Sequence, residues 1–245
     1  IWNYIGTDAT GLLVRGNDEG VVLDSTSGVV IGGSAAADRN VISGNLVRGV
    51  HLYLSNGTWI AGNTIGLDAT GVNALGNAQQ GVLLSSSNAN TIGTNADGSG
   101  DAGEGNVISA NGPQGVLLFA SSNNTIRGNS IFSNGTTTAH LGIDLGADGI
   151  LANDAGDVDT GANQLQNHPV LAWVTNTPTE TVFSGSLSGL AATTYAIDLY
   201  ANATTDLSGS GEGQVYLGST NLSADGSGNL NFTVALPVSP LPGRY

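Results

Sequence analysis

The sequence contains no cysteine, no methionine and, with all five of its basic residues being arginines, no lysine. Without cysteine, the chain has neither disulfides nor thiolate metal ligands. No apolar run is long enough to span a membrane, so we expect no membrane insertion. Charged residues are only 10% of the chain, and 19 acidic against five basic side chains give a net charge of -14. This balance repels nucleic acid and favours a neutral partner or divalent cations.

Asparagine, glycine and short apolar segments recur along the first part of the chain. The stretch NVISGNLVRGVHLYLSNGTWIAGN (40–63) returns 66 residues later as NVISANGPQGVLLFASSNNTIRGN (106–129). A tetrad of glycine, an apolar residue, any residue and leucine occurs at 20–23, 49–52, 81–84, 115–118 and 142–145. Short alternating segments between Gly and Asn turns predict strands, and no window has sustained helical spacing. The repeats therefore predict a parallel β-helix of about five rungs over residues 1–146, with long loops at two alternating corners and stacked asparagines at the bends.

These motifs resemble the right-handed parallel β-helix superfamily that includes the pectate lyases, in the Asn/Gly-rich form common in secreted bacterial repeat proteins. The resemblance implies a right-handed coil and a location outside the cell or on its surface. It does not specify an activity, because this fold hosts lyases, hydrolases, epimerases, tailspikes and adhesins. The chain lacks the acidic trio and GHG-type motif of polygalacturonases and the DPHE motif of alginate epimerases. Pectate lyases of this fold use Arg or Lys as the base, but this chain has no lysine, and its five arginines lie in turns, beside predicted strands or at the very end.

The repeat pattern ends after residue 146, and two further segments follow. Residues 147–167 are rich in Asp, Asn and Gly and form an acidic cap and linker in this interpretation. Residues 168–245 contain five alternating apolar and polar segments, which predict an incomplete, immunoglobulin-like β-sandwich. We therefore expect an all-β chain. The missing strands would leave an open sheet edge through which the chain could self-associate.

One outward column of the predicted coil is unusually apolar. Side chains alternate across a strand, so the second and fourth tetrad residues face inward and the third faces outward. The third tetrad positions include His51, Leu83 and Leu117. The positions two residues later, which face the same way, include Tyr53 and Phe119. An apolar surface of this kind indicates a covered face or a binding face. Two interpretations stay open: the sandwich or a second copy packs there, or the face binds a polysaccharide by stacking sugars.

Candidate catalytic residues lie on the same face. Asp24, His51 and Tyr53 occupy adjacent rungs, where a carboxylate beside an imidazole could make a general base and a tyrosine hydroxyl could act as the acid. The alternative is an ordinary polar pair. Asp8 and Asp68 recur in GTDATG and GLDATG, and because this repetition is typical of a turn, we interpret both as structural.

The acidic cap contains a candidate calcium site. Asn153, Asp154, Asp157, Asp159 and Asn163 supply oxygen ligands within a short stretch, and Ca²⁺ takes six to eight oxygens on flexible loops. We expect Ca²⁺ to bind here, between coil and sandwich. The alternative is a cap of Asx turns whose side chains bond only to the local backbone.

The composition and motifs favour a non-catalytic extracellular module of a larger secreted or surface protein, which displays loops or binds glycans. The alternative is a polysaccharide lyase or glycoside hydrolase that acts along the outer face.

Overall fold

The computed structural model describes residues 2–135, 140–206 and 208–238. The chain forms two compact units, and both draw on separate stretches of sequence. The first comprises residues 1–150, 161–163 and 206–214, and the second comprises residues 151–160, 164–205 and 215–245. The predicted cap at 147–167 is thus divided between the units, and a short piece of the predicted sandwich belongs to the first. The helices among the described residues are single turns: η1 (Ala36–Asp38), α1 (Asp101–Glu104) and η2 (Ala162–Leu165).

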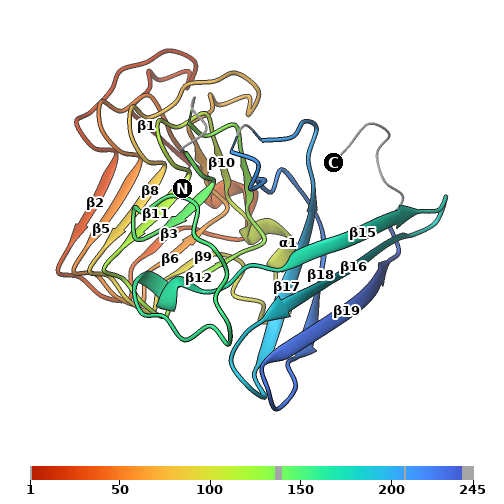
Figure 1. The fold of residues 1–245 in the computed structure, drawn as a ribbon. Helices are drawn as coiled ribbons and strands as arrows, with labels where there is room; N and C mark the ends of the chain where they lie inside the picture. Colours follow the sequence, from red (N-terminus) through yellow and green to blue (C-terminus); the bar gives the residue numbers. More distant parts are fainter. Residues whose placement is uncertain (1, 136–139, 207, 239–245) are drawn as a thin grey trace. The chain divides into compact units, whose positions relative to one another are not determined.

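The first unit is a right-handed parallel β-helix, as predicted (Figure 1). Successive strands fall on three parallel sheets in turn. One sheet has the order β1 (Asn3–Ile5), β4 (Asn40–Ile42), β7 (Thr64–Ile65), β10 (Val107–Ser109) and β13 (Ser130–Phe132). The second has the order β14 (Ile143–Leu145), β11 (Val116–Phe119), β8 (Val82–Ser85), β5 (Val50–Tyr53) and β2 (Val21–Asp24). The third has the order β12 (Thr125–Arg127), β9 (Thr91–Gly93), β6 (Trp59–Ala61) and β3 (Val30–Gly32).

The core consists of identical residues stacked rung on rung. Val50, Val82 and Val116 are register partners, and all three are fully buried. Isoleucines from the other two sheets join the same hydrophobic cluster. Because every rung presents the same small set of β-branched and leucine side chains, the rungs pack at a constant spacing. The tetrad pattern therefore predicts the inward positions correctly.

Buried asparagines form ladders along the corners, also as predicted. In one ladder the side-chain amide of Asn45 donates to Oδ1 of Asn77 at 2.8 Å, and Asn77 donates in turn to Asn111 at 2.8 Å. A second ladder runs from Asn63 through Asn106 to Asn129. The residue before each of these asparagines has a positive φ, as in Gly44, Gly62, Ala110 and Gly128. Placing the positive φ there leaves each amide free to point inward and bond to the next rung.

The first ladder ends on a carboxylate. Asn111 donates to Asn134, and Glu212 then accepts hydrogen bonds from the side-chain amide and backbone N–H of Asn134, each at 3.3 Å. The N–H of Ser133 also donates to Glu212. The adjacent Gly213 bridges to Ile131 of β13. Burial raises the pKa of Glu212 despite these hydrogen bonds. Glu212 thus supplies the acceptor that the next rung would otherwise provide.

Asp68 builds a turn, as the repetition of GTDATG and GLDATG predicts. Its carboxylate accepts hydrogen bonds from the hydroxyl and N–H of Thr70 and from the N–H and side-chain amide of Asn73. Gly71 supplies the positive φ of 73°. Burial acts to raise the pKa of Asp68, but the hydrogen bonds from Thr70 and Asn73 outweigh it and lower the value to about 2.

We therefore expect Asp68 to make stability depend on pH in the acid range. Because its folded pKa is depressed, its contribution is fully present above the ordinary value of 3.8 and is lost as the pH falls towards about 2. The contribution is on the order of 2 kcal/mol. Asp68→Asn should lower stability at neutral pH and flatten this acid dependence, as measured by melting temperature from pH 2 to pH 7. An unchanged acid dependence in the variant would contradict the assignment, and Asp18→Asn, at an exposed position, is the charge control.

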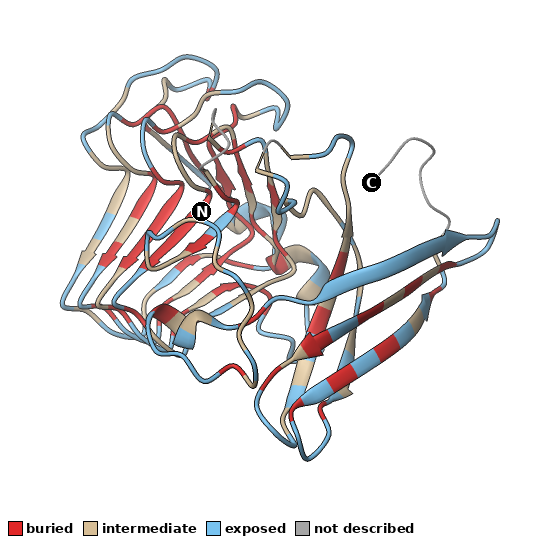
Figure 2. Ribbon diagram, viewed as in Figure 1, coloured by how far each residue is buried: buried red, intermediate tan, exposed pale blue. Residues whose placement is uncertain are grey.

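The second unit contains two antiparallel sheets around one core. A three-stranded sheet has the order β15 (Val170–Asn176), β16 (Thr181–Ser188) and β19 (Asn229–Leu236), and a two-stranded sheet pairs β17 (Thr194–Ala201) with β18 (Val215–Ser223). Strands of both sheets contribute to the core, including Phe183, Ile197 and Phe232. All five predicted strands are present. β15 is an edge strand, and all seven of its residues are exposed (Figure 2).

Candidate functional site

The outer face of the sheet of β2, β5, β8, β11 and β14 carries the predicted binding residues. His51, Leu83 and Leu117 are register partners in one column, and Tyr53 and Phe119 flank Ser85 in the next. Tyr53 and Phe119 are 43% and 53% exposed. The two leucines are only 7% exposed, so the face has no continuous exposed apolar patch at their positions. The exposed part of the face consists of separate aromatic side chains.

A row of hydrogen-bonded polar side chains crosses the same rungs. Arg48 bonds to Gln80 at 3.2 Å, Gln80 to Gln114 at 3.0 Å, and Gln114 to Asp144 at 3.0 Å. Asp144 is the register partner of Leu117. This polar row therefore runs from Arg48 to Asp144, where it meets the leucine column. These residues stand immediately before the glycine of each tetrad, except for Asp144, which stands within the last one.

A charged cluster lies at the Arg48 end of this polar row. Arg48 pairs with Glu19 at 2.6 Å, and Nδ1 of His51 lies 3.2 Å from the same carboxylate. Burial acts to raise the pKa of Glu19, but the hydrogen bonds and positive charges of Arg48 and His51 outweigh it, so the pKa is lowered. Glu19 is thus held ionised. The sequence motifs do not single out Glu19, although the alignment of Gly20 with Gly49 places it directly opposite Arg48.

The predicted catalytic trio is brought together only in part. Asp24 and Tyr53 are register partners, and the rings of His51 and Tyr53 lie 6.4 Å apart. The carboxylate that contacts the ring of His51 is that of Glu19 rather than that of Asp24. Asp24 instead accepts a hydrogen bond from the hydroxyl of Ser25 at 2.8 Å. A carboxylate that orients an imidazole is an element of general base catalysis. Here Arg48 shares that carboxylate, which is the arrangement of an ion-pair network.

Three of the five predicted metal ligands lie together in the second unit. Oxygen atoms of Asp154, Asp157 and Asp159 lie within 4.8 Å of one another. The two asparagines are engaged elsewhere. Asn153 makes two hydrogen bonds with the backbone of His168, and Asn163 belongs to the first unit, where its amide bonds with the backbone of Asn124. The candidate site therefore comprises the three aspartates.

A second acidic cluster was not predicted from the sequence. Asp97 precedes α1, and Asp101 and Glu104 are the first and last residues of α1, in the long connection before β10; their oxygens lie within 4.8 Å of one another. Backbone N–H groups of the same loop donate to all three, such as Asn95 to the buried Glu104 at 3.0 Å. These bonds indicate a loop stabilised by its own carboxylates. The alternation of Asp97 and Asp101 with glycines is the signal by which it could have been found.

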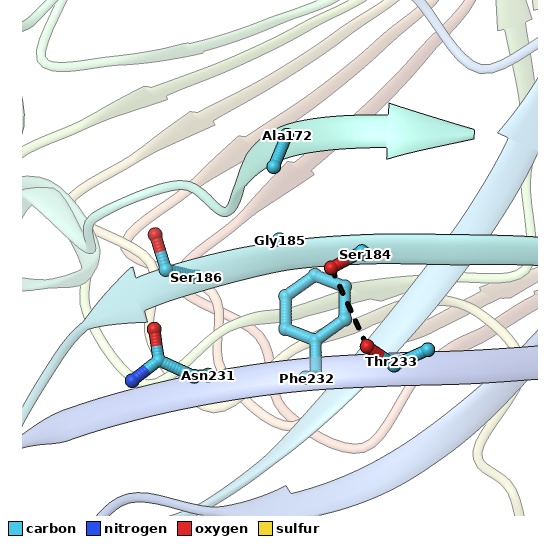
Figure 3. Close-up of a pocket in the computed structure, with 7 residues that line it drawn as sticks. All are labelled: Ala172, Ser184, Gly185, Ser186, Asn231, Phe232 and Thr233. Carbon is cyan, nitrogen blue, oxygen red and sulfur yellow. Dashed lines mark hydrogen bonds between the residues drawn. The ribbon is translucent and has the colours of Figure 1, made fainter.

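A shallow depression of about 340 Å³ lies on the three-stranded sheet of the second unit (Figure 3). Its lining is mostly small and polar, and a hydrogen bond of 3.4 Å joins Thr233 to Ser184. The ring of Phe232 lies so close to Gly185 that a Cβ there would be 2.7 Å from it. None of the predicted site residues lines this depression, and it contains no ionisable group.

A family model described as a right handed beta helix region matches residues 6–188, which is more than half of the chain. A search of curated protein sequences found no significant match to this protein's sequence. Among the described residues, no helix has the length and apolar character needed to cross a membrane.

Proposed function

Because the chain belongs to the right-handed β-helix family, we propose that it is a non-catalytic module of a secreted or surface protein that binds a neutral polysaccharide. The binding face is the outer side of β5, β8 and β11. The observation that carries this proposal is the exposure of Tyr53 and Phe119 in one column of the sheet. These aromatic rings stand two rungs apart, on the order of 10 Å, a span that accommodates an oligosaccharide.

The chemistry of the face supports a sugar chain as its ligand. Aromatic side chains offer an apolar surface at low cost in conformational entropy, and neighbouring hydroxyl and charged groups can bond to sugar hydroxyls. Ser85 lies between the two rings, and His51 lies beside Tyr53. A net charge of -14 disfavours acidic polysaccharides, so the neutral class is favoured.

Cleavage of the polysaccharide is the alternative, and the contact between Glu19 and His51 is the observation that favours it. Hydrolysis would need a second carboxylate acting with the first. Asp24 of β2 is a candidate on the same sheet, but its oxygen accepts a hydrogen bond from Ser25 instead. Binding without cleavage therefore accounts for the face with fewer assumptions.

We expect the double variant Tyr53→Ala/Phe119→Ala to bind its polysaccharide at least about 10-fold more weakly, because two stacking contacts are lost. The measurement is affinity electrophoresis or calorimetry against a panel of neutral polysaccharides. Trp2→Ala is the matched control, since Trp2 is an equally exposed aromatic residue of the same unit. It should leave binding unchanged.

The same panel distinguishes binding from cleavage. New reducing ends, or the ultraviolet absorbance of an unsaturated product, would establish an enzyme, and loss of that activity in Glu19→Gln or Asp24→Asn would locate it. Equal binding by the wild type and the double aromatic variant would refute the proposed face. A panel with no binding at all would refute the polysaccharide function.

A further inference from the structure

The loop of residues 154–159 is held in place by Asn167 and by the hydroxyl of Ser188, to which the N–H of Gly156 donates at 3.0 Å. Asn167 is buried and bonds to the backbone of Asp154 in both directions, at 3.0 Å and 2.8 Å. Its N–H donates to Oδ1 of Asp157 at 2.8 Å, and its side-chain amide also bonds to Ser188 at the end of β16. The loop is thus attached to the sheet, and its carboxylates converge as a consequence of this attachment.

One carboxylate oxygen at this place lacks the partner that burial requires. Oδ1 of Asp154 is buried and accepts no hydrogen bond from the described residues. Asp157 beside it is only 7% exposed, and its Oδ1 accepts the hydrogen bond from Asn167. A buried polar atom without a partner costs about 1–3 kcal/mol, and more when it is charged. Since the N–H of Val158 donates to the other oxygen of Asp154, Asx turns alone leave this cost in place.

The cluster also repels itself electrostatically. Oxygens of three carboxylates lie within 4.8 Å of one another, and the loop of residues 154–159 contains no basic residue. Like charges at this distance repel each other. A cation among the three carboxylates would remove the repulsion and give the buried oxygen of Asp154 a partner.

We propose that Asp154, Asp157 and Asp159 bind one Ca²⁺ ion, a site independent of the polysaccharide face. Ca²⁺ holds oxygens at 2.3–2.6 Å, so two ligands of one ion are at most about 5 Å apart, in agreement with oxygens that all lie within 4.8 Å. Mg²⁺ holds its ligands at about 2.1 Å in a strict octahedron and retains most of its water, which makes it the weaker competitor. Water completes the coordination of the Ca²⁺ ion.

The test compares calcium binding by the full chain and by Asp154→Asn/Asp157→Asn after removal of metals with EDTA. We expect the variant to bind one equivalent of Ca²⁺ less than the wild type in equilibrium dialysis. Wild-type melting of the second unit should shift upward by roughly 10 °C at a calcium concentration 100-fold above the dissociation constant. Without calcium the variant should melt at the same or a higher temperature than the wild type, since its repulsion is relieved.

Two further variants keep the test decisive. Asp159→Asn removes an exposed ligand that holds no hydrogen bond among the described residues, so the fold is unaffected, and it should weaken calcium binding by at least about 10-fold. Asp18→Asn/Glu180→Gln, at exposed positions, makes the same charge change as the double variant and should leave binding intact. Equal calcium binding by the wild type and both site variants would overturn the proposal. A melting shift reproduced by Mg²⁺ or by Na⁺ at matched ionic strength would also overturn it.

Discussion

Alanine at Gly66 is expected to destabilise the β-helix by about 4 kcal/mol or more, among the largest effects of single substitutions. Gly66 has a φ of 97°, which alanine adopts only under strain, and a Cβ there would lie 1.9 Å from the carbonyl oxygen of Ser109. The oxygen belongs to the backbone of the next rung and cannot rotate away. Two rungs must therefore separate, and the hydrogen bonds between them must lengthen.

Gly71→Ala is the matched control for this prediction. Gly71 also has a positive φ, of 73°, but a Cβ there meets nothing within 4 Å. Its substitution should cost only about 1–2 kcal/mol, from backbone strain alone. The measurement is denaturant unfolding of both variants, followed by circular dichroism. Similar losses in the two variants would show that contact between rungs does not limit the glycine positions.

The sequence predicts the β-helix because its determinants are local and repeated. Alternating apolar residues, glycine before each strand and asparagine at each bend recur in every rung, so the tetrads reveal the inward column that includes Val50 and Val116. The turn of Asp68 is predictable for the same reason. Because each rung contacts only its neighbours, aligning the copies of a repeated motif gives the register of the stacked strands.

The features that the sequence does not reveal depend on contacts that occur once. Glu212 completes the asparagine ladder from 78 residues beyond Asn134, and no periodicity links the two. Leu83 is the register partner of His51 in the outward column and is nevertheless only 7% exposed, which alternation along a strand does not indicate. Alternation gives the face of a residue but not what covers it.

The candidate sites show the same division. The convergence of Asp154, Asp157 and Asp159 follows from their proximity in sequence, whereas the exclusion of Asn163 follows from the division of the chain into two units. Spacing in the sequence alone assigns Asn163 and the three aspartates to one ligand set. The pairing of His51 with Glu19 rather than Asp24 likewise reflects the direction of side chains between rungs.

Asn111→Ala is expected to destabilise the β-helix by about 3–5 kcal/mol, because its ladder is fully buried. Oδ1 of Asn111 accepts hydrogen bonds from the side chain and the backbone N–H of Asn77, at 2.8 Å and 3.3 Å. Its amide donates to Asn134 at 3.0 Å and to the carbonyl of Ile65 at 3.1 Å. Alanine leaves these groups without this partner inside the coil, and each buried group left unpaired costs about 1–3 kcal/mol.

Two further variants separate the hydrogen bonds of Asn111 from its volume. Asn88 lies in an exposed row of asparagines and accepts one hydrogen bond from Ser122 at 2.7 Å, so Asn88→Ala should cost less than about 1 kcal/mol, since water can replace the acceptor. Asn111→Asp keeps the shape and the acceptor but turns an acid towards the oxygens of Ile65 and Asn134. Its folded pKa should therefore be raised, so its stability should be greatest at low pH and decline as the pH rises through that pKa. Denaturant unfolding at pH 4 and pH 7 measures both effects, and an Asn111→Asp variant as stable as the wild type at pH 7 would show that the amide donors of this ladder contribute little.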